Sequence, residues 1–266
     1  MSANYILNTN NQARDRLSLQ HHLYARSSIK LVKDGGVSTG MTGLEIGCGS
    51  GEMTIELAKL VGVQGSLLAI DLSQDQLNHV QYMTRNYKNI RFKQWDVNYL
   101  SDLGEQFDFI YCRMVLHHVK DAYSAILQMK NCLKPGGIII CEEPSIFDST
   151  FCSPPSKTYE QFTQWIRTCF TLNQCDFEIA HRLEQECASA NFKVKQHTLF
   201  QPLLRTAKEK QIYSMALQDV TPQLIHLNIA TQDEIDALSQ DLLSLANSEN
   251  TMTWIRMHQV IAELQS

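Results

Sequence analysis

Three glycines alternate with small residues at the end of a short apolar segment, in the stretch LEIGCGSG at residues 44–51. Glycine at every second position disfavours both a strand and a helix, because ordering each glycine costs more conformational entropy. The spacing of Gly47, Gly49 and Gly51 is GxGxG, whereas a dinucleotide turn has GxGxxG and a P-loop continues with Gly-Lys. We therefore expect a turn whose backbone approaches a ligand closely without binding a phosphate.

Carboxylates follow the glycines at the ends of successive apolar segments. Asp71 ends the second segment, Asp96 ends the third, and Glu142 with Glu143 ends the fifth. A carboxylate in the first of these places can accept hydrogen bonds from two ribose hydroxyls, and one in the second can accept from the exocyclic amine of adenine. Several acids together repel a pyrophosphate and attract a cation. The set indicates a cationic adenosine derivative, and S-adenosylmethionine has that chemistry.

The elements that would position these residues alternate between strand and helix from residue 42 onward. Apolar segments predict strands at 42–46, 66–70, 89–94, 107–113 and 137–143. Helical patterns separate them; Met53, Leu57, Leu60 and Val61, for example, recur on one helix face. This order predicts parallel βαβ units with helices on both faces of the sheet, and ligands bind beyond the carboxyl ends of such strands.

The regular alternation of predicted strands and helices ends after residue 150. SPPS at 153–156 interrupts the chain, and Tyr159, Phe162, Ile166 and Phe170 predict an amphipathic helix that forms either core or a lid over an apolar acceptor. A strand is expected at 193–200, weakly patterned helices at 203–248, and a strand at 252–264. The predicted organisation is a helical cap at 1–40, a ligand-binding core at 41–150, a helical cap or insert at 151–250 that includes strand 193–200 of the core sheet, and a final strand in 251–266.

Composition and charge argue against several classes of function. The net charge of −5 and the pI of about 6.0 argue against a duplex nucleic-acid partner. The eight cysteines have no CxxC and no metal-ligand spacing, so we expect reduced core thiols and no metal site. The opening MSANYILNTNNQARDR has no apolar core of a signal peptide, and no segment has the roughly 18 apolar residues of a membrane span. A cytoplasmic protein, monomeric or homodimeric, is expected.

Five motifs at consistent spacing carry a family resemblance. LEIGCGSG resembles the first motif of class I S-adenosylmethionine-dependent methyltransferases, and the similarity continues in register through AIDLS at 69–73, WDV at 95–97, FDFIYCRMVLHHVKD at 107–121 and LKPGG at 133–137. Together they resemble the quinone-biosynthesis and secondary-metabolite methyltransferases, which act mostly on small molecules. The resemblance covers residues 44–145 and implies a doubly wound, Rossmann-like α/β fold with a seven-stranded, mostly parallel sheet and a helical cap.

The resemblance also implies a set of cofactor contacts. The backbone at Gly47, Cys48 and Gly49 would approach the methionine part of S-adenosylmethionine, and the backbone at Arg113 would accept from its amine. Asp71 would bind the ribose hydroxyls, Leu72 would pack on adenine, Asp96 would accept the adenine amino group, and the Val97 amide would meet a ring nitrogen. The full candidate set is Glu45, Gly47, Cys48, Gly49, Asp71, Leu72, Gln76, Asp96, Val97, Arg113 and Tyr24.

Side chains at the margins of this set have less definite roles. Glu45 would help to hold the glycine loop, Gln76 would form a capping box with Ser73, and Tyr24 is our choice among four residues of the N-terminal cap that could close over the cofactor. The other three are Tyr5, Gln20 and His21.

Methyl transfer needs alignment of the acceptor more than it needs a catalytic triad. His118 is the candidate general base, with His117 as a second candidate, and Glu143 is expected to be a solvated acid. The acceptor atom, oxygen, nitrogen or carbon, stays open. The alternatives are a non-catalytic S-adenosylmethionine-binding regulator, a nicotinamide-dependent oxidoreductase, and a protein or RNA methyltransferase with a basic groove near Lys30, Lys33, Arg113 and Lys120.

Overall fold

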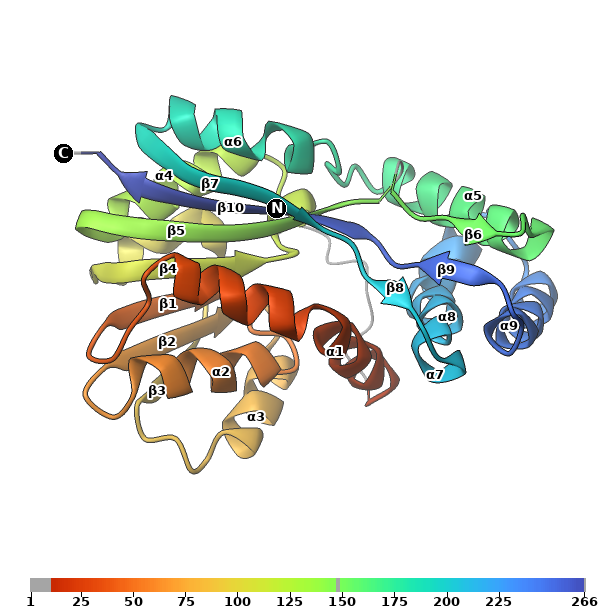
Figure 1. Cartoon of the computed structure of the whole chain (residues 1–266), viewed down its shortest axis with the longest axis horizontal. Coiled ribbons are helices and arrows are strands. Elements are labelled where there is room, and N and C mark those ends of the chain that lie inside the picture. Colours follow the sequence, from red (N-terminus) through yellow and green to blue (C-terminus); the bar gives the residue numbers. More distant parts are fainter. Residues whose placement is uncertain (1–10, 147–148, 266) are drawn as a thin grey trace.

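A seven-stranded sheet forms the centre of the computed structural model, which describes residues 11–146 and 149–265 (Figure 1). The strand order is β3-β2-β1-β4-β5-β10-β7. The bounds are β1 Thr42–Ile46, β2 Ser66–Asp71, β3 Ile90–Gln94, β4 Phe107–Arg113, β5 Leu133–Ser145, β7 Phe192–Phe200 and β10 Arg256–Leu264. Strands β1 to β5 pair in parallel, and β10 runs antiparallel to both of its neighbours. The predicted seven-stranded, mostly parallel sheet is therefore confirmed.

Helices cover both faces of the sheet (Figure 1). One face packs against α1 (Asn11–Asp34), α2 (Glu52–Val61) and α3 (Gln74–Met83). The other packs against the 3-10 helix η1 (Val97–Leu103), α4 (Ala122–Asn131) and α6 (Ile179–Ser189). Three of these helices begin where a polar side chain accepts from the backbone, at Ser73, Asp96 and Asp121. The side chains of Ser73, Asp96 and Asp121 thus fix the residues at which these three helices begin.

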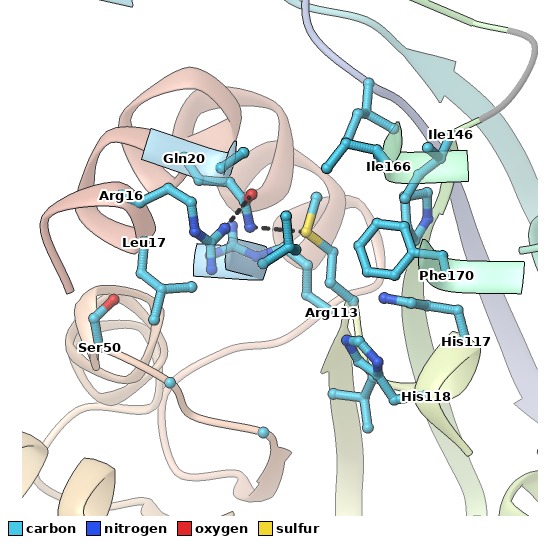
Figure 2. A pocket seen from close by; sticks show the side chains of 18 of the residues that line it. Arg16, Leu17, Gln20, Ser50, Arg113, His117, His118, Ile146, Ile166 and Phe170 are labelled. Carbon is cyan, nitrogen blue, oxygen red and sulfur yellow. Dashed lines mark hydrogen bonds between the residues drawn. The ribbon is translucent and has the colours of Figure 1, made fainter. Parts of the chain in front are cut away.

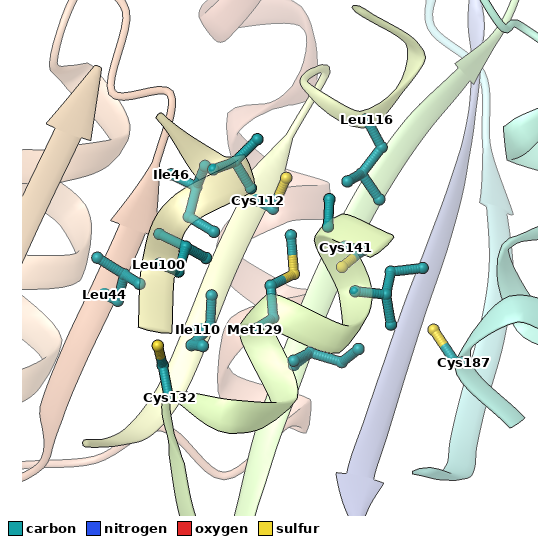
Figure 3. Close-up of a cluster of buried hydrophobic side chains, with 14 of the residues drawn as sticks. Leu44, Ile46, Leu100, Ile110, Cys112, Leu116, Met129, Cys132, Cys141 and Cys187 are labelled. Carbon is teal, nitrogen blue, oxygen red and sulfur yellow. The ribbon is translucent and has the colours of Figure 1, made fainter. Parts of the chain in front are cut away.

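The core on the α4 and α6 face is rich in sulfur (Figure 3). Cys112, Cys132, Cys141 and Cys187 pack there among aliphatic side chains and are almost completely buried. All eight cysteines of the chain are free thiols, and six of them are buried. Burial raises the pKa of Cys187, so this thiol stays protonated and packs as a small apolar group.

A second group of elements lies beyond the carboxyl ends of the parallel strands (Figure 1). It contains α5 (Lys157–Leu172), α7 (Ala207–Lys210), α8 (Ile212–His226) and α9 (Gln232–Ala246), with a small sheet in the order β6-β9-β8. The strands of that sheet are β6 Cys152–Ser153, β8 Leu203–Leu204 and β9 Thr251–Thr253. We call these elements the cap. The cap has its own apolar cluster, which includes Phe162, Tyr213 and Trp254.

The C-terminal segment is not the single strand expected at 252–264. It forms β9 in the cap sheet and β10 in the central sheet, with Trp254 and Ile255 between them. The Trp254 amide donates to the carbonyl of Pro202 at 2.9 Å, so the backbone leaves one sheet before it enters the other. A β-rich sequence pattern cannot distinguish one continuous strand from two strands in different sheets, because both segments are extended and largely buried.

Glu142, in the middle of the sheet, ties α1 to the strands. Its carboxylate is completely buried and accepts from the hydroxyl of Tyr111, from Ser28 Oγ at 3.0 Å and from Gln259 Nε2 at 2.6 Å. Arg113 Nη1 donates to the same Ser28 hydroxyl at 3.2 Å. One buried anion therefore joins α1, β4, β5 and β10, and an anion without water must have such partners.

Among the residues that the structure describes, no helix is both long enough and apolar enough to cross a bilayer.

Replacing Glu142 with alanine should lower the free energy of unfolding by about 3–5 kcal/mol, because the substitution leaves the polar partners of a buried charge unpaired. Denaturant titration measures the change. The matched control is Glu263→Ala, which removes an exposed pair with Lys195 and should leave the free energy of unfolding close to that of the wild type. Equal losses in the two variants would contradict a structural role for the buried network.

Candidate functional site

A cavity of about 690 Å³ lies between the carboxyl ends of the strands, the start of α1 and the cap. Figure 2 shows Arg16 and Gln20 of α1 on one side, Ile166 and Phe170 of α5 on the other, and Arg113 between them. The volume falls within the roughly 300–1,000 Å³ of small-molecule sites. Nine of the predicted site residues line this cavity: Gly47, Cys48, Gly49, Asp71, Leu72, Asp96, Val97, Arg113 and His118.

The glycine loop folds onto the end of β2. The amides of Gly47 and Cys48 donate to the carbonyl of Ile70 at 2.9 and 3.1 Å. Gly47 has φ +72°, and a Cβ there would lie 2.5 Å from Val115 Cγ2. Gly49 has φ +52°, yet a Cβ there would meet only Leu17, at 3.9 Å. Gly47 is therefore required by packing, whereas Gly49 keeps the backbone bare beside the cavity.

Two aspartates stand at the polar end of the cavity. Asp71 accepts from the amides of Gly49 and Ser73 at 3.0 and 2.9 Å. Burial raises the pKa of Asp71, and these amide donors oppose the shift. Asp96 accepts from the backbone amide of Asn98 at 2.9 Å through Oδ1. Since a carboxylate has about four acceptor positions, each aspartate can still accept from a ligand.

Three predicted site residues, Glu45, Gln76 and Tyr24, lie away from the cavity lining. Gln76 is buried, and its side-chain amide has no hydrogen-bond partner among the described residues. The expected capping box is only half formed: Ser73 Oγ accepts from the Gln76 amide at 3.3 Å, but the Ser73 amide is bonded to Asp71 instead. Tyr24 is fully buried, packs against Phe200 and donates to the carbonyl of Ile255. It therefore joins α1 to the cap and cannot close over a ligand as we expected.

The predicted rim of acids is largely internal. Glu45, Glu142 and Glu143 are each at most 2% exposed, and none lines the cavity. Glu45 lies on β1, where burial raises its pKa to about 8, against 4.5 for an ordinary glutamate. It does not contact the cavity from this position. The acids that do reach the polar end of the cavity are Asp71, Asp96 and Glu52.

Arg113 lines the cavity at the end of β4, but its guanidinium turns toward α1. Nη1 donates to Ser28 Oγ, and Nη2 lies 3.5 Å from His21 Nδ1. Burial and the nearby guanidinium lower the pKa of His21 to about 4. Of the N-terminal candidates, Gln20 lines the cavity, His21 does not, and Tyr5 lies outside the described residues.

Glu143 builds the turn that follows β4, and our expectation that it would be solvated is wrong. Its Oε1 accepts from the amides of Val115 and Leu116 at 2.9 and 2.8 Å. Its Oε2 accepts from the His117 amide at 3.3 Å and lies 2.7 Å from His117 Nδ1. Met114 begins the turn with φ +56°, a conformation that a non-glycine residue adopts at some cost.

The two histidines after this turn both line the cavity. His117 lies flat against Phe177, with ring centroids 4.8 Å apart, and next to His118 at 4.0 Å. His118 Nδ1 lies 3.8 Å from the Cys175 sulfur. Burial lowers the pKa of His118 well below its usual value, and the neighbouring His117 and Arg16 add to this effect. His118 is thus neutral and a weak base.

The far wall of the cavity comes from the cap and is mostly apolar. Phe162, Ile166 and Phe170 of the predicted amphipathic helix are buried and also line the cavity, so this stripe serves both as core and as cavity wall. Tyr159, Tyr213, Val220 and Trp254 extend the same surface.

Arg16 is a site residue that sequence reasoning missed. It is 5% exposed, forms an ion pair through Nε with Asp219 of α8, and donates from Nη1 to Gln20 Oε1 at 3.0 Å. Its Nη2 has no hydrogen-bond partner among the described residues. No local pattern could identify Arg16, because Asp219 lies 203 positions away in the chain.

Within the described part of the chain, no three His, Cys, Asp or Glu side chains are grouped as ligands of a metal ion.

Comparison with known proteins agrees with this geometry. A family model described as a methyltransferase domain matches residues 19–197. A demethylmenaquinone methyltransferase of Staphylococcus aureus is 33% identical over 129 residues, which are 48% of this chain and 53% of that enzyme. The chain thus spans about half the length of the curated relatives it matches.

Solved structures show the same fold at low sequence identity. The YcgJ protein of Bacillus subtilis has a TM-score of 0.60 at 14% identity, with 91% of this chain and 99% of that one covered. A protein from Bacillus halodurans, named as a putative methyltransferase, has a TM-score of 0.58 at 16% identity, with 91% of this chain and 100% of that one covered.

The raised pKa of Glu45 predicts how stability changes with pH. Between pH 4.5 and about 8 the folded state keeps a proton that the unfolded state has lost, so the free energy of unfolding should fall as the pH rises through this window. The contribution is about 1.4 kcal/mol per pH unit. Glu45→Gln should flatten this slope in denaturant titrations, whereas the exposed control Glu249→Gln should retain it. A slope that persists in Glu45→Gln would contradict the assignment.

Proposed function

The chain belongs to the methyltransferase domain family, and from that premise we propose that it is an S-adenosylmethionine-dependent methyltransferase acting on a small, largely apolar acceptor. The observation that carries the proposal is one continuous cavity with two unlike ends. The end at the strands presents glycine backbone and two aspartates, and the end at the cap presents mainly aromatic and aliphatic side chains, with Glu160 and Arg167 of α5 also in the lining.

The polar end fits the adenosine part of the cofactor. Asp71 would accept from the ribose hydroxyls with the positions that the Gly49 and Ser73 amides leave open. Asp96 Oδ2, which has no hydrogen-bond partner among the described residues, would accept from the adenine amine, and the Val97 amide would meet the ring. Leu72 is 40% exposed and could pack on the adenine face. Of the candidate residues, Glu45, Gln76 and Tyr24 are left out of this proposal.

The methionine part would lie between the glycine loop and the start of α1. Leu17 approaches Gly49, and Arg16 lies one residue before it. The unpaired Nη2 of a buried arginine costs free energy, and a carboxylate is the partner that a guanidinium binds most strongly. We assign Nη2 of Arg16 to the carboxylate of the cofactor's methionine.

The apolar end would hold the acceptor against the methyl group. When bound, S-adenosylmethionine supplies an electrophilic methyl group on a sulfonium. The protein's own contribution is to align the acceptor and to exclude water, and a wall of Phe162, Ile166, Phe170 and Trp254 does both. The name of the Staphylococcus aureus relative supports an aromatic acceptor of this kind.

Other candidate functions have less support. A cofactor-binding regulator would need no acceptor space, yet the cavity continues under the cap. The basic groove that would favour protein or RNA methylation is weakened at two of its four positions: Arg113 bonds inward to Ser28, and Lys30 pairs with Asp34. A nicotinamide cofactor would require a pyrophosphate beside Asp71.

Asp71→Asn should weaken S-adenosylmethionine binding about 10- to 100-fold, since hydrogen bonds to a charged group contribute about 1.5–3 kcal/mol. Isothermal titration calorimetry measures this, with NADH tested in parallel and expected not to bind. The control Asp121→Asn alters a helix cap outside the cavity lining and should leave binding unchanged. Binding of NADH in place of S-adenosylmethionine would refute the proposal.

The double variant Arg16→Gln/Asp219→Asn removes both charges of the buried pair, so neither is left unpaired. It should weaken S-adenosylhomocysteine binding roughly tenfold or more through the lost carboxylate contact. Binding of 5′-methylthioadenosine, which has the nucleoside but no amino acid, should not change. If both ligands lose affinity equally, Arg16 supports the fold of the site and does not contact the carboxylate.

A further inference from the structure

We infer that His117, held by Glu143, removes a proton from the methyl acceptor, so the acceptor is a hydroxyl compound of the phenol or enol class. This inference rests on the proposed function and names the substrate class of the same site. It differs from the sequence-based choice of His118, and it narrows a question that the sequence left open, because it assigns the acceptor an acidic hydroxyl and not a free amine.

The protonation of His117 follows from its partner. Oε2 of Glu143 lies 2.7 Å from His117 Nδ1, and a carboxylate only accepts hydrogen bonds. Nδ1 therefore carries a proton, and Nε2 is the ring nitrogen that is left to accept one from a ligand. Glu143 is 0% exposed and also accepts from the amides of Val115 and Leu116, so it is firmly held.

The position of the ring suits proton transfer at the cavity. His117 lines the cavity, and Figure 2 shows its side chain extending from the η2 turn (Leu116–His118) toward the interior. The ring lies between Phe177 and His118, and the His117 carbonyl accepts from the Asp176 amide at 2.9 Å. Three ring contacts, with Glu143, Phe177 and His118, thus hold the imidazole at the cavity lining, and a general base must be positioned in this way.

His118 lies in a different environment from His117. Its Nδ1 faces the Cys175 sulfur, and burial lowers its pKa well below the usual value. We therefore assign His118 to the cavity wall and to the positioning of His117.

The proton balance favours a hydroxyl acceptor over an amine, and methylation at oxygen shows how it closes. In a hydroxyl acceptor the O–H bond breaks, the proton moves to Nε2 of His117, and the oxygen lone pair forms the new O–CH3 bond. The C–S bond of the sulfonium breaks with its electrons going to sulfur, which leaves neutral S-adenosylhomocysteine. The proton on His117 then passes to solvent. An unprotonated amine has a lone pair ready to react and needs no base before methyl transfer.

The test compares acceptors that differ in acidity. The variant His117→Asn keeps a side-chain N–H near the position of Nδ1 for Glu143 and removes Nε2. With the weakly acidic 2-naphthol, kcat/KM should fall roughly 10²- to 10⁴-fold, the usual contribution of a general base. With 4-nitrophenol, largely ionised near neutral pH, the loss should be at least tenfold smaller. S-adenosylmethionine affinity, measured by calorimetry, should stay within about twofold of the wild type because the dyad is placed at the acceptor.

Phe177→Leu is the matched control, because it disturbs the packing of the same ring without removing Nε2. Its effect should be equal for 2-naphthol and 4-nitrophenol. Equal losses for the two phenols in His117→Asn would overturn the inference and indicate a structural role. Methylation of 2-naphthylamine but of neither phenol, or no phenol turnover by a wild-type protein that binds S-adenosylmethionine, would also overturn it and leave the proposed cofactor site standing. Absence of S-adenosylmethionine binding would refute the proposed function itself.

Discussion

Two adjacent buried carboxylates on β5 determine how the rest of the site is arranged. Because neighbouring residues of a strand point to opposite faces, Glu142 and Glu143 serve different layers of the molecule. Glu142 bonds to Tyr111, Ser28 and Gln259 and thereby holds α1 on its face of the sheet. Glu143 bonds to three successive amides after β4 and to the ring of His117. Both carboxylates are 0% exposed, so both require these partners and in turn fix them in place.

The consequence is a cavity whose walls are held from both sides. With α1 fixed to the sheet, Arg16 and Gln20 lie over the glycine loop, and the ion pair of Arg16 with Asp219 joins α1 to the cap. With the turn after β4 fixed, His117 faces the same space. The cap closes the remaining side with apolar groups. A ligand that enters therefore passes from a polar to an apolar surface within one enclosure, which is the arrangement that an in-line transfer between a charged donor and an apolar acceptor needs.

The acidic side chains in this region form two groups: some hold the scaffold together, and others can contact a ligand. Glu45, Glu142 and Glu143 are internal and serve the scaffold, whereas Asp71 and Asp96 keep acceptor capacity at the cavity. In the sequence, all five are acidic residues that lie in a predicted strand or directly after one. Their separation depends on which strand residue points to which layer, and on whether a hydroxyl or an amide from another element reaches the carboxylate first. For Asp71 the donors lie 2 and 22 positions away in the chain, and for Glu142 they lie 31 or more positions away.

The sequence by itself determined those features of this protein that depend on residues close together in the chain. Hydrophobic periodicity and the motifs around Gly47, Asp71 and Asp96 predicted the order of the first five strands, the parallel sheet and the strand-end position of the site, because helix caps, turns and βαβ connections depend on neighbours in the chain. Only the tertiary structure decided that Tyr24 and Gln76 lie outside the cavity lining. Burial and hydrogen-bond partnership depend on contacts between residues far apart in sequence, and a single sequence contains no local signal for them.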